Sequence, residues 1–305
     1  MPFTGDVSAA KRGNQFVLIG TPVGHSLSPV MHNAVYGAAK VDWYYHAIDC
    51  PTEQEALHQI DLVRTGTYRG MNITMPYKRL ALSCADFADP SAAAAGGANV
   101  LVRRGFDLCA YNTDGYGAVG AIERLTGIDY RNKRACVCGT GPTAMAIACA
   151  LATKNMREIV IFSRNIEKAQ AAVEHLETCL EEAPSHHFTI AEYEDAWRHI
   201  PQAAVIIDAT PRGMQPDDEA IIDPCLFHEG QVVFDVVYGH GLTKLVKGAR
   251  EQGATALDGT EMLVEQAALA IEIWQDVLGY DFAIDRALMR GPRMQGVQQQ
   301  EEDDL

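Results

Sequence analysis

Two successive series of short apolar runs, each alternating with stretches of helical periodicity, constrain the fold of this chain most strongly. The first series begins near residue 15 with FVLIG and continues through GMNITMP. The second begins with RACVCG and continues through EIVIFSR and AVIIDAT to VVFDVVY. Such alternation is typical of βαβ units, and strands that are apolar throughout are expected where helices cover both faces of a parallel sheet. The sequence therefore predicts an α/β fold.

The length of the chain favours two domains. At 305 residues, it is near the size above which one hydrophobic core usually gives way to two. The stretch YGAVGAIERLTG lies between the two series and has helical periodicity, so we place the domain boundary near residue 118. The ends of the chain, over 1–14 and 291–305, are polar and lack periodicity, which predicts disordered tails.

The charge of the chain argues against polyanionic partners. A net charge of −15 provides no basic surface for nucleic acid or an anionic membrane, so a small anionic ligand would need a local cationic pocket. No apolar run approaches the ~20 residues that span a bilayer, and the N-terminal stretch does not have the pattern of a secretory signal. We therefore expect a cytoplasmic protein, monomeric or homodimeric, that acts on a small molecule.

Cysteine and histidine spacing predicts no metal site. The eight cysteines and ten histidines are scattered, with no Cys-x-x-Cys pair and no two histidines at a spacing typical of metal ligands. Cys136 and Cys138 lie in an apolar run and are expected to be reduced core thiols. His25 and His32 are interpreted as structural residues.

A glycine-rich turn opens the second series. Gly139, Gly141 and Ala144 follow an apolar run over 134–138, and a helical stretch and a further apolar run over 158–162 come next. In a dinucleotide-binding unit the first glycine allows the tight turn, the second lets the backbone approach the pyrophosphate, and the alanine permits close helix packing. The helix N-terminus then faces the phosphates. A tight turn in an ordinary βαβ unit is the alternative.

The residues after 158–162 bear on which dinucleotide binds. An NAD enzyme usually has Asp or Glu there for the ribose 2′-hydroxyl, whereas this chain has Ser163, Arg164 and Asn165. The planar, permanently charged guanidinium of Arg164 suits a 2′-phosphate, and Lys168 is one helical turn further on. NADP is favoured, although NAD stays possible, and a solvated surface arginine is the alternative interpretation.

Polar side chains follow the ends of predicted strands in the first series, and further polar side chains occur between residues 99 and 114. They are Ser26, Ser28, Asn72, Thr74, Lys78, Asn99, Asn112, Thr113 and Asp114. Such strand ends line the ligand crevice of α/β sheets, and this set suits a small polyhydroxylated acid. Ser28 could instead cap a helix, and Asn112 and Asp114 could form turns. Lys78 begins a predicted helix, where a cation is disfavoured, so a functional role is favoured there.

These residues carry a resemblance to the shikimate dehydrogenase family, from about residue 16 to 275. Its motifs HSxSPxxHN, NxTxPxK, YNTDG, ATPxGM, DVVY and DGxxMLxxQA occur here, in that order, at His25–Asn33, Asn72–Lys78, Tyr111–Gly115, Ala209–Met214, Asp235–Tyr238 and Asp258–Ala267. Several short motifs in the family's order are far more specific than any one of them.

The resemblance implies a fold, an activity and a set of site residues. The activity is reversible NADPH-dependent reduction of 3-dehydroshikimate to shikimate in aromatic amino acid biosynthesis. The implied fold is an N-terminal α/β substrate domain plus a Rossmann-type NADP-binding domain, with C-terminal helices returning to the first domain. The domain ranges are 15–118 with 259–290 for substrate and 119–258 for the dinucleotide. Lys78 and Asp114 would be the catalytic pair.

The resemblance also implies the binding residues. Those for substrate are Ser26, Ser28, Thr74, Asn99, Tyr238 and Gln266. Those for the cofactor are Gly139, Thr140, Gly141, Pro142, Thr143, Ser163, Arg164, Asn165, Lys168, Val236 and Gly259.

Two residues and one loop depart from the family pattern. Pro142 stands where Gly or Ala is common, Asp208 stands where Asn is usual, and Gly239–Lys244 replaces NPxxTP. Two alternatives to a shikimate dehydrogenase stay open: a quinate or quinate/shikimate dehydrogenase that uses NAD, and a non-catalytic homologue that binds ligand. Arg164 favours shikimate and NADP, and retention of Lys78 and Asp114 argues against the non-catalytic homologue.

Overall fold

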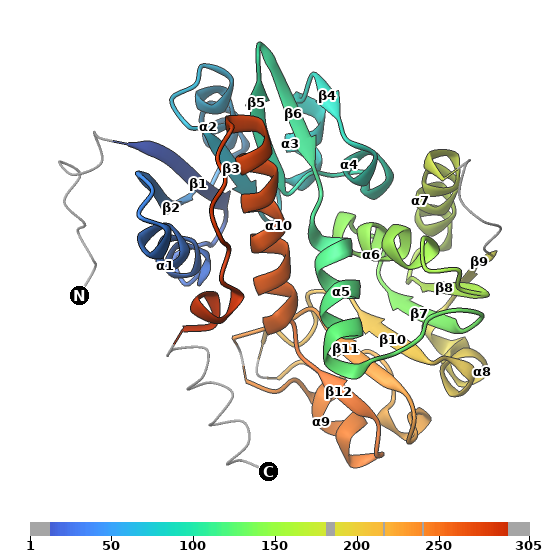
Figure 1. Cartoon of the computed structure of the whole chain (residues 1–305). Coiled ribbons are helices and arrows are strands. Elements are labelled where there is room, and N and C mark those ends of the chain that lie inside the picture. The colour runs from blue at the N-terminus through green and yellow to red at the C-terminus, as the bar shows by residue number, and fades with distance from the viewer. Residues whose placement is uncertain (1–12, 181–186, 216, 240, 292–305) are drawn as a thin grey trace. The chain divides into compact units, whose positions relative to one another are not determined.

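A computed structural model describes residues 13–180, 187–215, 217–239 and 241–291 (Figure 1). These residues form two compact units. Unit 1 comprises the described residues up to Asp89, with Ala98–Tyr111 and Ala267–Gly291, and unit 2 comprises Pro90–Gly97 and Asn112–Gln266. The predicted disordered tails lie outside the described residues, apart from residues 13, 14 and 291.

Unit 1 contains a mixed sheet of six strands in the order β2-β1-β3-β5-β6-β4. The strands are β1 (Asn14–Gly20), β2 (Trp43–Asp49), β3 (Gly70–Ile73), β4 (Phe87–Ala88), β5 (Val100–Arg104) and β6 (Asp107–Tyr111). Its helices include α1 (Ser28–Ala39), α2 (Glu53–Arg64) and α3 (Lys78–Cys84). The first three strands pair in parallel, as βαβ alternation predicts, whereas β5 and β6 form an antiparallel hairpin that the sequence analysis does not anticipate. Gly105, at φ +65°, lies in the turn of this hairpin.

The C-terminal helix α10 (Thr260–Leu278) completes the core of unit 1 from Ala267 onward, as the family resemblance predicts. Its Trp274 is fully buried, with its ring centroid 4.7 Å from that of Phe16. Gly70 makes this packing possible, because a Cβ at Gly70 would lie 2.4 Å from Trp274 Nε1. His32 stacks on Tyr45 with ring centroids 4.0 Å apart, and burial lowers the pKa of His32 to about 3. His32 therefore lies neutral in the core of unit 1.

Unit 2 contains a sheet of six strands in the order β12-β11-β10-β7-β8-β9, all parallel. The strands are β7 (Arg134–Cys138), β8 (Glu158–Phe162), β9 (His187–Ala191), β10 (Val205–Asp208), β11 (Val232–Asp235) and β12 (Thr255–Leu257). Two half-sheets that diverge from a central first strand are the Rossmann topology, and the structure confirms this part of the predicted fold.

Helices cover both faces of the unit 2 sheet (Figure 1). One face packs against α4 (Pro90–Ala95), α5 (Asp114–Thr126), α6 (Pro142–Ala152) and α7 (Ile166–Cys179), and the other against α8 (Ala196–His199) and α9 (Lys244–Glu251). Along β7, Ala135 and Val137 enter the first core while Cys136 and Cys138 enter the second. Both cysteines are buried free thiols, as predicted.

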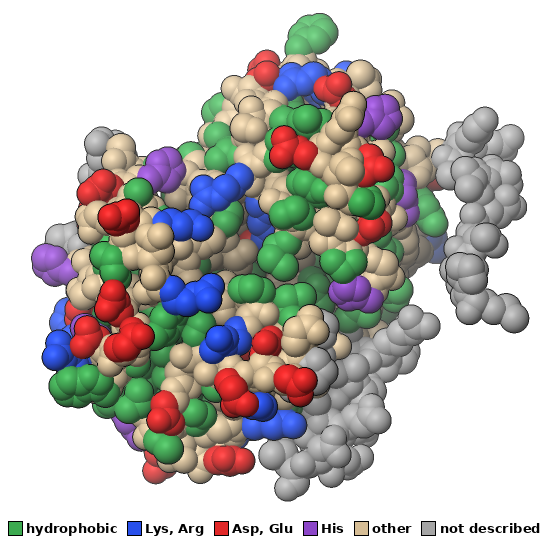
Figure 2. All heavy atoms as spheres, turned by 180° about the vertical axis from the view of Figure 1, so that it is seen from behind, with side chains coloured by type: hydrophobic (Ala, Val, Ile, Leu, Met, Phe, Trp, Pro, Cys, Tyr) green, Lys and Arg blue, Asp and Glu red, His purple; other side chains and the backbone are tan. Residues whose placement is uncertain are grey.

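The surface mixes charges of both signs. Figure 2 shows Lys and Arg side chains interspersed with Asp and Glu on the face that it presents. None of the helices in the described ranges has the length and hydrophobicity that crossing a bilayer requires.

Candidate functional site

Two linked serines lie in unit 1 where the loop after β1 enters α1. Ser26 Oγ donates a hydrogen bond to Ser28 Oγ at 3.2 Å, and it accepts one from the Ser28 backbone N–H at 3.2 Å. Ser28 is buried and is the first residue of α1, while Leu27 holds the N-cap position without a side-chain capping bond. Ser28 is therefore not a helix cap. The two hydroxyls lie at a helix N-terminus, where a negative charge is stabilised.

Thr74 and Lys78 follow β3 at the same edge of the unit 1 sheet. The Thr74 backbone N–H donates to Ile19 O at 2.9 Å, which ties the end of β3 to the end of β1. Gly20 permits this approach, because a Cβ there would lie 2.3 Å from Thr74 Cγ2. Lys78 is half-buried and begins α3, as predicted, and its carbonyl accepts from the Ala98 N–H at 2.8 Å.

Asn99 lies at this edge because β5 runs antiparallel to β3. It is buried, and its backbone N–H donates to Tyr111 O at 3.0 Å. Its carbonyl accepts from Asn72 Nδ2 at 3.1 Å, while Asn72 Oδ1 accepts from the Tyr45 hydroxyl at 2.7 Å. Asn72 is thus a structural residue that aligns two strand ends. Within unit 1, the segments that carry these residues therefore meet at one edge of the sheet. The residues are Ser26, Ser28, Thr74, Lys78 and Asn99.

Asp114 is a buried carboxylate at the start of α5 in unit 2. Its backbone N–H donates to Asn112 Oδ1 at 3.0 Å, and Asn112 Nδ2 donates to Gly97 O at 2.8 Å. Asp114 Oδ2 accepts a hydrogen bond from Thr143 Oγ1 at 3.0 Å. Asn112 therefore forms the turn, as its alternative interpretation suggests, while the Asp114 carboxylate is held by a side chain of α6.

Two glycines let α5 pack closely on its neighbours. A Cβ at Gly115 would lie 2.0 Å from Ala146 O, and one at Gly117 would lie 2.9 Å from Gln266 Cβ. Gln266 is further fixed because its carbonyl accepts from Thr113 Oγ1 at 3.0 Å. Gly117 and Thr113 thus place Gln266 directly beside α5.

Tyr238 and Gly259 follow β11 and β12 of the same sheet. Burial raises the pKa of Tyr238 above its usual value, and the Asp114 carboxylate raises it further. The phenol is therefore protonated near this carboxylate. Gly259 packs against Val236, since a Cβ at Gly259 would lie 2.1 Å from Val236 O. The structure thus brings Tyr238, Asp114 and Gln266 to one side of unit 2, and Val236 and Gly259 into contact.

The glycine turn after β7 has room for a ligand. Gly139 has φ +108°, a conformation that disfavours a side chain. Gly141 is the N-cap residue of α6, and a Cβ there would meet no described atom within 4 Å. Pro142 occupies the first turn of α6, where proline is favoured, so this departure from the family pattern fits the helix. The first turn carries no acidic residue, so the helix N-terminus can accept an anion.

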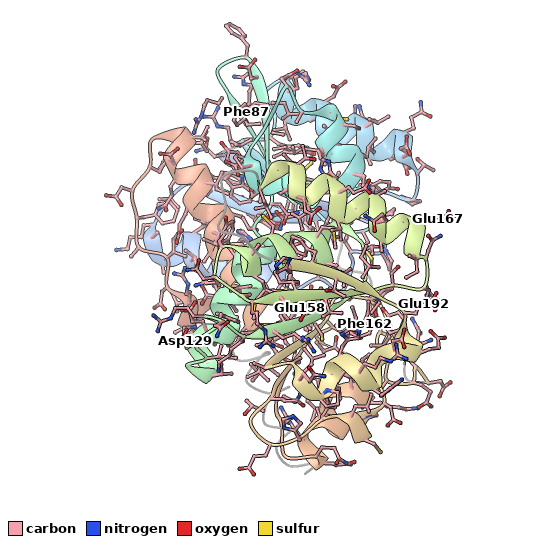
Figure 3. The ribbon with its side chains drawn as sticks, turned by 90° about the vertical axis from the view of Figure 1, so that its right-hand side faces the viewer. Phe87, Asp129, Glu158, Phe162, Glu167 and Glu192 are labelled. Atoms are coloured by element: carbon pink, nitrogen blue, oxygen red, sulfur yellow. The ribbon has the colours of Figure 1, made fainter. Side chains whose placement is uncertain are left out.

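The loop after β8 divides into turn-forming and exposed residues. Ser163 Oγ donates to Asn165 O at 3.0 Å, and Asn165 Oδ1 caps α7 by accepting from the Lys168 N–H at 2.8 Å. The side chains of Arg164 and Lys168 are exposed, and within the described ranges neither has an ion-pair partner. In Figure 3, Phe162 and Glu167 lie on the carboxyl-terminal side of β8, opposite Glu158. Two unpaired cations are thus available at this edge.

Arg212 is a further exposed cation that the sequence analysis does not single out. Its backbone N–H donates to Thr210 Oγ1 at 3.3 Å, and the Thr210 methyl group lies 3.4 Å from the position of a Cβ on Gly139. Burial raises the pKa of Tyr193, and the charges of Arg164 and Arg212 both oppose this rise. Both guanidinium groups therefore lie near Tyr193. The sequence signal that could have identified Arg212 is a positive charge in the loop that follows a predicted strand, in a chain with a net charge of −15.

Asp208 and Asp235 are buried carboxylates paired in register at the ends of β10 and β11. Burial, together with the nearby Asp235, raises the pKa of Asp208 to about 7, and burial raises that of Asp235 to about 6. Asp208 Oδ1 accepts from the Thr210 N–H at 2.9 Å, and Asp235 Oδ2 accepts from Thr243 Oγ1 at 2.7 Å. Asp208 therefore keeps its proton at a pH well above the range in which an ordinary aspartic acid side chain loses it.

Asp208→Asn is expected to stabilise the protein above pH 7. The folded-state pKa of Asp208 is raised from 3.8 to about 7, so wild-type stability falls as the pH rises through this interval. Each unit of pKa difference corresponds to about 1.4 kcal/mol, which predicts a gain of roughly 2 to 4 kcal/mol at pH 8 and little change near pH 4. Urea unfolding across this range measures the gain. Asp217→Asn, at an exposed carboxyl, is the control, and equal pH dependence in both variants would contradict the assignment.

No group of three or more His, Cys, Asp or Glu side chains in the described ranges is placed to hold a metal ion.

Two family models match the chain. Residues 18–101 match a shikimate dehydrogenase substrate binding domain, and residues 121–221 match shikimate / quinate 5-dehydrogenase. Shikimate dehydrogenase (NADP(+)) from Methanopyrus kandleri is 34% identical over 88% of this chain and 92% of that protein.

Solved structures share the fold. The shikimate 5-dehydrogenase of Thermus thermophilus in complex with NADP(H) and shikimate has a TM-score of 0.78 and 26% identity, over 94% of this chain and 99% of that one. The quinate dehydrogenase of Corynebacterium glutamicum in complex with NAD has a TM-score of 0.80 and 25% identity, over 93% of this chain and 99% of that one.

Proposed function

Because the chain belongs to the shikimate dehydrogenase family, we propose that it catalyses the reversible NADPH-dependent reduction of 3-dehydroshikimate to shikimate. This reaction serves the biosynthesis of aromatic amino acids. One observation carries the proposal: Ser26, Ser28, Thr74 and Lys78 follow neighbouring parallel strands of unit 1, at the edge where α/β sheets bind ligands.

The residues of unit 2 fit an NADP cofactor. Gly141 leaves the backbone at the start of α6 uncovered, and the N-terminus of α6 suits the pyrophosphate. Arg164 and Lys168, exposed at the end of β8, suit the 2′-phosphate, while Ser163 and Asn165 shape the turn that presents them. When bound, the dinucleotide supplies or accepts the hydride. The further cofactor contacts belong to Thr140, Pro142, Thr143, Val236 and Gly259.

The substrate is a carboxylic acid with several hydroxyl groups. We assign its carboxylate to Ser26 and Ser28, because their linked hydroxyls lie at the N-terminus of α1. Its hydroxyl groups are assigned to the remaining polar residues of the proposed site, which are Thr74, Asn99, Asp114, Tyr238 and Gln266.

In this proposal, Lys78 and Asp114 carry out the proton transfer that accompanies hydride transfer. Reduction of the ketone develops negative charge on the carbonyl oxygen, which must receive a proton. The Lys78 ammonium stabilises this charge and donates the proton, and in the oxidative direction Lys78 accepts a proton from the substrate hydroxyl. Asp114 holds the substrate hydroxyl in the orientation that proton transfer requires.

We also propose the setting in which the enzyme acts. It is cytoplasmic, is a monomer or homodimer, and has small molecules as its ligands. The proposed substrate domain spans 15–118 with 259–290 and the proposed dinucleotide domain spans 119–258, whereas the compact units divide the chain at Tyr111 and Gln266 and place Pro90–Gly97 in unit 2.

Initial rates with shikimate and quinate, each with NAD and NADP, test the proposed function. We expect the highest kcat/KM with shikimate and NADP. A preference for quinate and NAD would favour a quinate dehydrogenase, the activity of the Corynebacterium glutamicum relative. Ligand binding without turnover in all four combinations would identify a non-catalytic homologue.

Ser28→Ala is expected to raise the KM for shikimate by about 10-fold with a smaller change in kcat. A hydroxyl that binds a spectator carboxylate contributes about equally in the ground state and the transition state, and a hydrogen bond to a charged group is worth about 1.5 to 3 kcal/mol. Steady-state kinetics measures both constants. Ser83→Ala removes an exposed α3 hydroxyl that donates to Leu80 O, and it serves as the control. An unchanged KM with a collapsed kcat would contradict the role of Ser28.

A further inference from the structure

Thr143 stands in the cofactor turn, yet its hydroxyl bonds to the proposed catalytic carboxylate. Its Oγ1 donates to Asp114 Oδ2 at 3.0 Å. Thr143 belongs to the first turn of α6, so its backbone N–H is among those that a bound pyrophosphate would meet. The side chain and the backbone of this residue therefore have different tasks.

The packing of α5 on α6 maintains this hydrogen bond. Gly115 directly follows Asp114, and a Cβ on it would lie 2.0 Å from Ala146 O. The Asp114 backbone is also fixed, since its N–H donates to Asn112 Oδ1 at 3.0 Å. Asp114 is 4% exposed, so water competes little for its carboxylate. A hydrogen bond to a charged group in such a setting is stronger and more directional than one in water.

We propose that Thr143 is a positioning residue, which orients the Asp114 carboxylate for the substrate hydroxyl and links it to the helix that binds the cofactor. This inference rests on the proposed function. It assigns to the Thr143 hydroxyl a role in the chemical step, in place of a contact with the dinucleotide. Valine at this position would keep the shape of the side chain and lose the donor, whereas serine would keep the donor.

The first test compares Thr143→Val with Thr143→Ser. Thr143→Val should lower kcat for shikimate oxidation by about 10-fold, the effect of losing one charge-assisted hydrogen bond. The dissociation constant of NADPH, from fluorescence titration, should stay within about twofold, because the backbone contacts persist. Thr143→Ser should retain most of the wild-type kcat. Weaker NADPH binding with normal kcat in Thr143→Val would overturn the proposal and make the hydroxyl a cofactor ligand.

The second test uses Asp114→Asn as the background. If Thr143 acts through Asp114, then Thr143→Val should change kcat by less than about twofold in the Asp114→Asn enzyme. A full 10-fold loss in that background would show that Thr143 acts elsewhere.

The third test needs no turnover, so it separates this inference from the proposed function. The unfolding midpoints of the two single variants and the double variant form a thermodynamic cycle. An interaction between the side chains predicts that the double variant differs from the sum of the single shifts by about 2 °C or more. Additive shifts would overturn the interaction even in an active enzyme. Absence of shikimate turnover in the wild-type protein would instead overturn the proposed function.

Discussion

Replacing Lys78 with methionine is expected to lower kcat by about 10²- to 10⁴-fold, the usual contribution of a general acid or base. Lys78 is proposed to move a proton in the transition state, so its loss should affect kcat more than the KM for shikimate. Methionine keeps much of the aliphatic stem and removes the charge and the proton. NADPH affinity should be unchanged, because the proposed cofactor residues belong to unit 2 and Lys78 to unit 1.

A matched control lies next to Lys78 in the same helix. Arg79 is exposed, so Arg79→Met removes one positive charge from α3 and should leave kcat near the wild-type value. Unfolding midpoints of both variants show whether the fold is kept. Near-normal turnover in Lys78→Met would rule out the assigned mechanism without affecting the family membership of the chain.

Asp114→Asn is expected to impair turnover as well. The family resemblance pairs Asp114 with Lys78, and residues that act as a unit give non-additive losses. The double variant should therefore lose much less activity than the product of the two single losses. Multiplicative losses would show that the two side chains act independently.

Features that depend on local spacing could be predicted from the sequence. Gly139 and Gly141 mark a turn, which the structure shows between β7 and α6. Gly139 has a positive φ that favours glycine, and Gly141 is the N-cap residue of α6. The covering of the unit 2 sheet by helices on both faces follows from strands that are apolar on both faces, while its Rossmann strand order was expected only from the family resemblance. These features need no knowledge of which distant residues meet.

Features that depend on distant contacts could not be predicted. The Thr143–Asp114 hydrogen bond joins two helices, and only the close approach at Gly115 brings these residues together. Ser28 resembles a helix cap in sequence because it precedes a proline, yet the helix begins at Ser28 itself. Arg212 stands at a variable position of its motif, and only the fold brings its loop against the glycine turn. The assigned roles of the site residues stay predictions.

Arg164→Asp is expected to reverse the cofactor preference of the enzyme. The side chain follows β8, is exposed, and within the described ranges has no ion-pair partner, so it is available for the 2′-phosphate of NADP. Aspartate would repel this phosphate and accept a hydrogen bond from the ribose 2′-hydroxyl of NAD. We expect kcat/KM with NADP to fall by about 10²-fold or more, since a charge-assisted hydrogen bond is replaced by repulsion. The value with NAD should rise.

The control for Arg164→Asp makes the same change of charge at the other end of the same strand. Arg157 is exposed and directly precedes β8, so Arg157→Asp alters the net charge of the enzyme equally but lies at the amino edge of the sheet. The ratio of kcat/KM for NADP to that for NAD should stay at the wild-type value in this control. If both variants shift the ratio equally, a general electrostatic effect explains it. If neither does, Arg164 is a surface charge, and Lys168 and Arg212 become the cations to replace next.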